Sequence, residues 1–301
     1  MKSSTNIVFS EKPKLKQPVM VCGISGWVDG GQAATGGIEY LIKKLSANRF
    51  AEMHAARFHL FQVPGQLSLR PYIRIEDGLL KEHRLPQNQF YYWASPDDGN
   101  DLILFLGTEP NMNWEEYTGG ILGIAKGFEA TRIYLLGGVL DKTPHTKEPA
   151  VSCTCSSPEL KKEMQKYGVQ FTNYEGPGRY GTTLLYSCQE KGMEMVTFTA
   201  RTTYYPEFNI VISHNPTAIR ALVRRLDRLL KTGLDMADLD EEVGEFVSNL
   251  NSMTSHRPEF RAYIEQLEKG FTEFKYEEPL EMSPGEAVEM AEEFLKQKKD
   301  E

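Results

Sequence analysis

The sequence predicts an α/β protein with a three-layer α/β/α arrangement, a mostly parallel central sheet and a C-terminal helical extension. Two observations lead to this prediction. Up to Gly233, β-branched and apolar segments alternate with stretches of helical periodicity, which is typical of a parallel sheet covered on both faces. After Gly233 the chain is acidic, helical in pattern and poor in strand formers.

Composition restricts the class of protein. The 301 residues are enough for one large or two small domains. The net charge of −8 argues against nucleic-acid and anionic-membrane partners. No apolar run reaches the roughly 20 residues of a membrane span, and Met1–Gln17 lacks an apolar signal segment, so we expect a cytoplasmic protein. We divide it into a flexible segment 1–16, an α/β core 17–232 and a helical extension 233–301.

Segments rich in apolar and β-branched residues predict the strands. They are Val19–Ile24, Arg57–Val63, Gln89–Ala94, Asp101–Gly107, Arg132–Val139, Val151–Cys155 and Met195–Ala200. Around the strong turn dipeptide Asp77-Gly78, the segments Arg70–Ile75 and Gly78–Arg84 predict a β-hairpin.

Apolar residues at helical spacing predict the helices. In the core these are Gly36–Leu45, Trp114–Phe128, Pro158–Tyr167, Gly181–Lys191 and Pro216–Leu230. In the extension they are Leu239–Leu250, Pro258–Phe271 and a short charged helix, Glu286–Lys298.

The glycine-rich turn between Gly23 and Gly36 is the most informative local feature. It follows an apolar strand and precedes a helix, so it lies at the carboxyl edge of the predicted sheet, where open α/β proteins place their sites. No Lys-Ser/Thr follows the glycines, and the spacing is not that of a dinucleotide-binding loop. The turn therefore predicts a site without identifying its ligand.

Further loops gather polar residues after strands, and polar groups that converge at one edge suit a small-molecule site. The candidate catalytic residues are Asp29, Glu109, Asp141 and His145. The candidate ligand-binding residues are Gly23, Ser25, Gly26, Trp27, Gly30, Gly31, Thr108, Asn111, Thr143, Tyr174 and Glu175.

Most of these candidates also have a structural explanation. Ser25 misses the nucleophile elbow Gly-x-Ser-x-Gly by one position, which favours a turn residue. His145 is either an acid–base catalyst, because the reference pKa of histidine lies near 6.5, or a residue that anchors its loop by hydrogen bonds. Glu109 is either catalytic or a cap of the helix that starts near Asn113. Trp27 and Trp114 either line a cleft or belong to the core.

The cysteines do not predict a metal site or a cofactor. Cys153 and Cys155 are separated by one residue, which matches no zinc or redox motif, although alternation along a strand would place both thiols on one face. With His145 nearby they would still fall short of the four ligands of a closed site. We expect reduced cysteines, no bound metal and no cofactor.

Several motifs together resemble the proteasome assembly chaperone family, specifically its bacterial and archaeal branch, from about Gln17 to Leu230. The motifs are Gly-x-x-Gly-Trp-x-Asp-Gly-Gly at 23–31, Gly-Thr-Glu-Pro-Asn-x-x-Trp at 107–114, Gly-x-Leu-Asp-x-x-Pro-His-Thr at 138–146, Tyr-Glu-Gly-Pro at 174–177 and Asn-Pro-x-Ala at 215–218. The resemblance implies a fold similar to purine nucleoside phosphorylases and a homo-oligomer, for which we expect a trimer.

The resemblance also implies a function in protein assembly. We expect a chaperone-like factor that acts through protein contacts with an unidentified client. The chain ends in Lys298-Lys299-Asp300-Glu301, without the hydrophobic-Tyr-x tail with which some members dock on the proteasome, so we do not expect that docking mode. The alternative is a small-molecule binder or an enzyme (a hydrolase, phosphorylase-like enzyme or ligase) that uses the cleft at the sheet edge.

Overall fold

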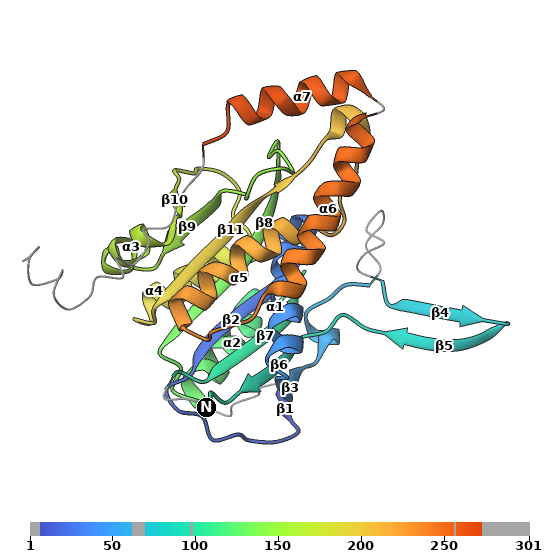
Figure 1. Cartoon of the computed structure of the whole chain (residues 1–301). Helices are drawn as coiled ribbons and strands as arrows, with labels where there is room; N and C mark the ends of the chain where they lie inside the picture. The colour runs from blue at the N-terminus through green and yellow to red at the C-terminus, as the bar shows by residue number, and fades with distance from the viewer. Residues whose placement is uncertain (1–6, 62–69, 97–98, 256, 273–301) are drawn as a thin grey trace, which may run out of the picture.

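A nine-stranded mixed sheet forms the centre of the computed structural model, which describes residues 7–61, 70–96, 99–255 and 257–272 (Figure 1). The strand order is β1-β3-β6-β7-β2-β8-β11-β9-β10. The strands are β1 Ile7–Phe9, β2 Val19–Ser25, β3 Asn48–Met53, β6 Gln89–Trp93, β7 Leu102–Thr108, β8 Arg132–Asp141, β9 Val151–Cys155, β10 Gln170–Phe171 and β11 Met195–Thr203. The four central strands β7, β2, β8 and β11 are parallel, while β6 and β9 pair with them antiparallel on either side.

Helices cover both faces of this sheet. The helices are α1 Ala33–Lys44, α2 Trp114–Gly127, α3 Pro158–Met164, α4 Tyr180–Glu190 and α5 Pro216–Leu230. Helices α1, α3 and α5 pack on one face, and α2 and α4 on the other. The predicted three-layer α/β/α class is confirmed.

The central strand β2 is buried on both faces, which explains its continuous apolar sequence. Val19 and Val21 point toward α1 and α5, whereas Met20 and Cys22 point toward α2 and α4. Gly23 lets α1 approach the strand closely, because a Cβ there would collide with the Ala34 carbonyl oxygen and with Ile38.

Two strands at one side of the sheet differ from the prediction. The strand expected over Arg57–Val63 is wrong in its described part, where Ala55–Arg57 forms a 3-10 helix. The strand of this region is instead β3, which lies second from the edge of the sheet, between β1 and β6. Strand β1 was not predicted; it lies within the segment that we expected to be flexible.

The predicted hairpin is confirmed as β4 Tyr72–Glu76 and β5 Leu79–Arg84, a separate two-stranded sheet that extends from the body (Figure 1). Asp77 and Gly78 both have positive φ, 50° and 75°, as a two-residue type I′ turn requires.

Two helices follow the core, α6 Ala237–Ser255 and α7 Pro258–Lys269. Helix α6 packs beside α5, and α7 contributes Phe260 and Ile264 to a small apolar cluster around Tyr205, just after β11. The predicted helix Glu286–Lys298 lies outside the described residues. Within the described ranges, no helix is long and apolar enough to span a bilayer.

The close contact of β2 with α1 gives a stability prediction. We expect Gly23→Ala to lower the free energy of unfolding by about 1–3 kcal/mol, because the methyl group must displace the α1 backbone. The control is Gly123→Ala on α2, where an added Cβ meets no atom within 4 Å and Ala raises helix propensity. Urea unfolding measures both, and equal stability of the two variants would contradict the packing argument.

Candidate functional site

The loops after β2, β7 and β8 meet at the carboxyl edge because the three strands are parallel neighbours. They are joined by backbone hydrogen bonds. Glu109 N–H donates to the Ser25 carbonyl oxygen at 2.7 Å, and Gly138 N–H donates to the Val28 carbonyl oxygen at 3.0 Å. The edge is therefore a set of mutually bonded loops.

The Asp29 carboxylate closes the glycine-rich turn onto the start of α1. Its Oδ1 accepts hydrogen bonds from Ala34 N–H at 2.8 Å and Thr35 N–H at 3.1 Å, and Oδ2 accepts from the Thr35 hydroxyl at 2.6 Å. Burial raises the pKa of Asp29, against the lowering effect of these hydrogen bonds. Asp29 acts here as a helix-capping carboxylate.

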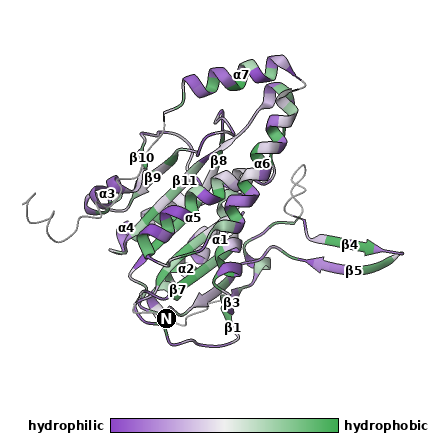
Figure 2. Cartoon of the chain, in the orientation of Figure 1, coloured by the Kyte–Doolittle hydropathy of each residue, from purple (hydrophilic) through white to green (hydrophobic). Residues whose placement is uncertain are grey.

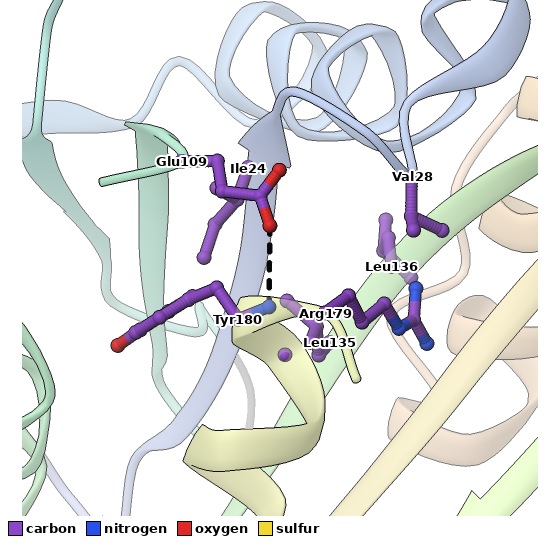
Figure 3. Close-up of a pocket in the computed structure, with 8 residues that line it drawn as sticks. Ile24, Val28, Glu109, Leu135, Leu136, Arg179 and Tyr180 are labelled. Atoms are coloured by element: carbon purple, nitrogen blue, oxygen red, sulfur yellow. Dashed lines mark hydrogen bonds between the residues drawn. The ribbon is translucent and has the colours of Figure 1, made fainter. Parts of the chain in front are cut away.

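Glu109 links three segments through one carboxylate. Its Oε2 accepts from Trp27 N–H at 2.8 Å, and its Oε1 accepts from Tyr180 N–H at 3.2 Å, at the N-terminus of α4 (Figure 3). It packs against Gly26, whose φ of 146° and close approach leave no space for a Cβ. The prediction that Glu109 caps the helix near Asn113 is thus corrected: its carboxylate bonds the start of α4.

A small cavity lies beside Glu109 (Figure 3). It is lined by Ile24, Val28, Glu109, Leu135, Leu136, Arg179, Tyr180 and Gly181. Its volume is about 20 Å³, room for roughly one water molecule, whereas small-molecule pockets hold about 300–1,000 Å³. Burial lowers the pKa of Arg179, which the nearby Glu109 charge opposes, and its Nη2 donates to the Thr199 hydroxyl at 3.1 Å.

His145 belongs to a second cluster, which joins the core to the C-terminal helices. Its side chain is 1% exposed. Nδ1 lies 2.9 Å from the Tyr205 hydroxyl, and Nε2 lies 3.1 Å from Asn251 Oδ1 on α6. A neutral ring with Nε2 protonated satisfies both contacts, and burial lowers the pKa of His145 accordingly. Next to it, the Thr146 hydroxyl donates to Glu268 of α7.

Asp141, the last residue of β8, and Thr143, in the loop that follows it, also have internal partners. Asp141 Oδ2 accepts from Arg201 Nη1 at 3.0 Å, and its Oδ1 accepts from Lys142 N–H at 2.8 Å. Thr143 is buried, and its carbonyl oxygen lies 3.3 Å from the Tyr205 hydroxyl oxygen, whose single hydrogen is directed to His145 Nδ1.

The loop after β7 is held by Asn111 and by Asn88, a buried residue that the sequence analysis missed. Asn88 Oδ1 accepts from Thr108 N–H at 3.1 Å and from the Tyr117 hydroxyl at 2.7 Å. Asn111 Oδ1 accepts from Leu60 N–H at 3.1 Å. No pattern around Asn88 signals this role, since its partners come from β7 and α2.

The glycines after β2 bring the turn close to neighbouring segments. Gly31 has a φ of 61°, and its carbonyl oxygen accepts from Asn215 N–H at 2.8 Å. A Cβ on Gly30 would lie 3.1–3.2 Å from Leu140. Asn215 then caps α5 by accepting from Ala218 N–H at 3.0 Å. An Asn-Pro pair before an apolar stripe is a sequence signal for such a cap.

Two predicted aromatic candidates point outward. The Trp27 side chain is 66% exposed, and Tyr174 is 74% exposed, with its hydroxyl donating to the Pro177 carbonyl oxygen at 3.0 Å. Glu175, next to Tyr174, is exposed as well. Trp114 instead packs edge-to-face on Tyr180.

The Cys153 and Cys155 sulfur atoms lie 3.6 Å apart. Within the described part of the chain, no three His, Cys, Asp or Glu side chains lie together as a metal site would require.

The sequence and the structure of this chain are similar to those of known proteins. The PAC2 family model matches residues 23–254. A proteasome-assembly chaperone homologue from Mycobacterium tuberculosis is 27% identical, with a TM-score of 0.71 over 82% of this chain and 99% of the other. A PAC2 family protein from Streptomyces avermitilis is 27% identical, with a TM-score of 0.68 over 78% and 95%. An archaeal proteasome activator from Pyrococcus furiosus shares the fold, at 23% identity and a TM-score of 0.64 over 82% and 97%. No significantly similar sequence is found among curated proteins.

The buried neutral imidazole of His145 gives a pH prediction. Because its folded pKa lies below the unfolded value of 6.5, folding favours the neutral form. Its contribution to stability is present above pH 6.5 and is lost as the pH falls toward the lower folded pKa. Lowering the pH from 7 to 5 should reduce the free energy of unfolding of both proteins. We expect the reduction to be about 1 kcal/mol smaller in His145→Gln than in the parent.

Urea unfolding at the two pH values measures this difference. The control is the same substitution at an exposed position, His54→Gln. A parental pH dependence in His145→Gln would show that the ring titrates alike in the folded and unfolded chain.

Proposed function

Because the chain belongs to the PAC2 family, we propose that it is a chaperone-like assembly factor that acts through protein contacts in the cytoplasm. The proteasome assembly chaperone homologue among the similar structures supports this function. The client is a protein of unidentified class. The family model covers both the hydrogen-bonded loops at the sheet edge and most of α6.

The observation that carries the proposal is how the polar groups of the edge are used. Asp29 and Glu109 accept hydrogen bonds from neighbouring loops and helix starts, which is how a scaffold uses carboxylates. The adjoining cavity of about 20 Å³ has room for a water molecule but not for a metabolite. This arrangement favours a protein-binding surface over the alternative of an enzyme. We call this surface, formed by the loops after β2, β7 and β8, the rim.

Trp27 is the best candidate for a client contact on this rim. Its backbone N–H is fixed by the Glu109 carboxylate, while its indole is 66% exposed. A backbone that is already fixed lowers the entropic cost of binding a partner there, and Trp is enriched among the residues that dominate protein interfaces.

We expect Trp27→Ala to reduce client binding by at least tenfold at an unchanged melting temperature, because the indole makes no core contribution. Proteins that co-purify stoichiometrically with the tagged chain from its own cells would be identified, and their affinity for parent and variant measured. The matched control is Tyr186→Ala on α4, at 60% exposure. The absence of a stoichiometric partner, or equal loss in both variants, would contradict the proposed rim.

The enzyme alternative has its own test. We expect nucleotides, nucleosides and inorganic phosphate not to bind at the carboxyl edge, and so not to raise the melting temperature through that site, because its cavity of about 20 Å³ has no room for them. A second hollow of about 440 Å³, lined by Glu207 and Arg257 among others, shares no lining residue with that cavity, and Arg257→Ala is the control that separates binding there. Thermal-shift titration measures this, since a ligand at about 100 times its dissociation constant adds roughly 2.7 kcal/mol to folding stability. A concentration-dependent rise with any of them would favour the small-molecule reading.

We also propose that the chain forms a closed homo-oligomer, and we expect a trimer. Closed symmetric assemblies are the commonest form of soluble oligomers. Multi-angle light scattering at micromolar concentration should give three times the protomer mass. A mass equal to one protomer would contradict this expectation.

A further inference from the structure

The β4–β5 hairpin, residues 72–84, is an arm that extends away from the body (Figure 1). Every residue of β4 is exposed, and so is β5 apart from the half-buried Glu82. A two-stranded hairpin alone is marginally stable in water, and three or more strands with an apolar face are needed for independent stability. The arm therefore has the properties of an incomplete sheet.

The two faces of the arm differ in chemistry. The pairing of Ile75 with Leu80 and of Ile73 with His83 places the three apolar side chains on one face. Their exposed fractions are 52% for Ile73, 60% for Ile75 and 62% for Leu80. Hydrophobic residues are visible on both strands of the arm in Figure 2.

The charged side chains on the opposite face form ion pairs with one another. Arg74 forms ion pairs with Glu76 at 2.6 Å and with Glu82 at 3.3 Å. The Arg84 guanidinium lies 4.4 Å from the centre of the Tyr72 ring. This face also carries Leu79, which lies opposite Glu76 and is 61% exposed, so it is mainly but not wholly charged.

Only one edge of the arm is suited to pairing with another strand. On β5 the register shifts, leaving Lys81 as an extra residue between Leu80 and Glu82. Bulges and lysines are the devices that protect edge strands from pairing. Strand β4 runs from Tyr72 to Glu76 without proline or lysine, and no described strand other than β5 pairs with it.

We propose that β4 is the surface through which two copies of this chain pair, antiparallel, about a two-fold axis centred on Ile75. In this register Ile75 lies opposite Ile75 of the second copy, and Arg74 of each copy lies opposite Glu76 of the other. Opposite charges and apolar pairs directly across two strands stabilise the pairing. The result is a four-stranded sheet in which Ile75 and Leu80 of both copies form one apolar row, while Ile73 of each copy lies opposite Asp77 in the turn of the other.

The charge pattern selects the register and the partner. An axis centred on Arg74 would place two guanidinium groups opposite each other, which is destabilising. Shifting the pairing by a single residue would place the apolar face of one arm beside the polar face of the other. Strand β4 is thus complementary to itself, as a contact between identical copies requires.

This inference goes beyond the proposed function, because arm pairing needs no client and does not involve Trp27. It is also compatible with a trimer formed through the body, since paired arms would then join two trimers. Failure of arm pairing would leave client binding at the rim intact, and the two results are separately measurable.

Disulfide cross-linking of the full chain tests the pairing. In Ile75→Cys the two Cα atoms would lie about 4.5–5.5 Å apart, within the range of about 4.4–6.8 Å that a disulfide spans. Mild oxidation should therefore give a covalent dimer on a non-reducing gel, at least tenfold more than in the parent. The matched control is Leu80→Cys, on the same face and equally exposed, where three strand spacings of about 4.8 Å separate the two thiols. No dimer with Ile75→Cys, or equal dimer with Leu80→Cys, would overturn the proposal.

A charge-swap experiment tests the register. In the Ile75→Cys background, Arg74→Glu places carboxylates opposite each other and Glu76→Arg places guanidinium groups opposite each other, so each variant alone should lose most of the dimer. Mixing the two variants restores both opposite-charge pairs and should restore cross-linking, as a heterodimer that tags of different mass identify. Melting temperatures within about 2 °C of the parent would exclude misfolding. Unchanged dimer in each variant alone, or no recovery on mixing, would overturn the register.

Discussion

The parallel pairing of β2 with both β7 and β8 is the constraint on which the carboxyl edge depends. It brings the loops after these three strands together at one edge of the sheet, beside the start of α4. Their backbone groups bond one another, and the Glu109 carboxylate accepts from two remaining donors, on Trp27 and Tyr180. Both oxygens of the half-buried Glu109 carboxylate are thus used in holding the loops together.

The C-terminal helices are attached to the same edge by a different set of contacts. His145 bonds Asn251 of α6, and Thr146 bonds Glu268 of α7, so one loop after β8 holds both helices. Phe260 and Tyr205 pack edge-to-face, with ring centres 5.2 Å apart. The neutral state of a single imidazole is thus coupled to the placement of these helices, although it has no part in the Glu109 cavity.

Capping and turn residues in the sequence predicted the helices and turns whose structure depends on neighbouring residues. The Asn215-Pro216 start and the apolar stripe predicted α5 correctly at both ends, and Asp77-Gly78 predicted the hairpin turn. Strand β3 could not be recognised from its sequence, Asn-Arg-Phe-Ala-Glu-Met, because its pairing is imposed by β1 and β6. A short strand of mixed polarity has little pattern of its own.

In the candidate site, too, the sequence predicted local features but not contacts between distant residues. The sequence identified Glu109 and His145 as unusual residues and allowed each a structural role. It could not identify their partners, because Tyr180 lies 71 residues from Glu109 and Asn251 lies 106 residues from His145. Asn88 was missed because nothing in its immediate neighbourhood sets it apart, and only the fold brings it to the loop after β7. Arg179 was not named as a candidate, although it follows the Tyr-Glu-Gly-Pro motif at 174–177 by two residues.

The separation of the arm from the body has an evolutionary consequence. Substitutions in β4 and β5 change exposed side chains that the core does not require, so selection on folding leaves them almost free to vary. The body can be maintained for one purpose while the arm diverges for another. Paralogues in one cell could thereby come to assemble only with themselves, through a few charge exchanges on a single short strand.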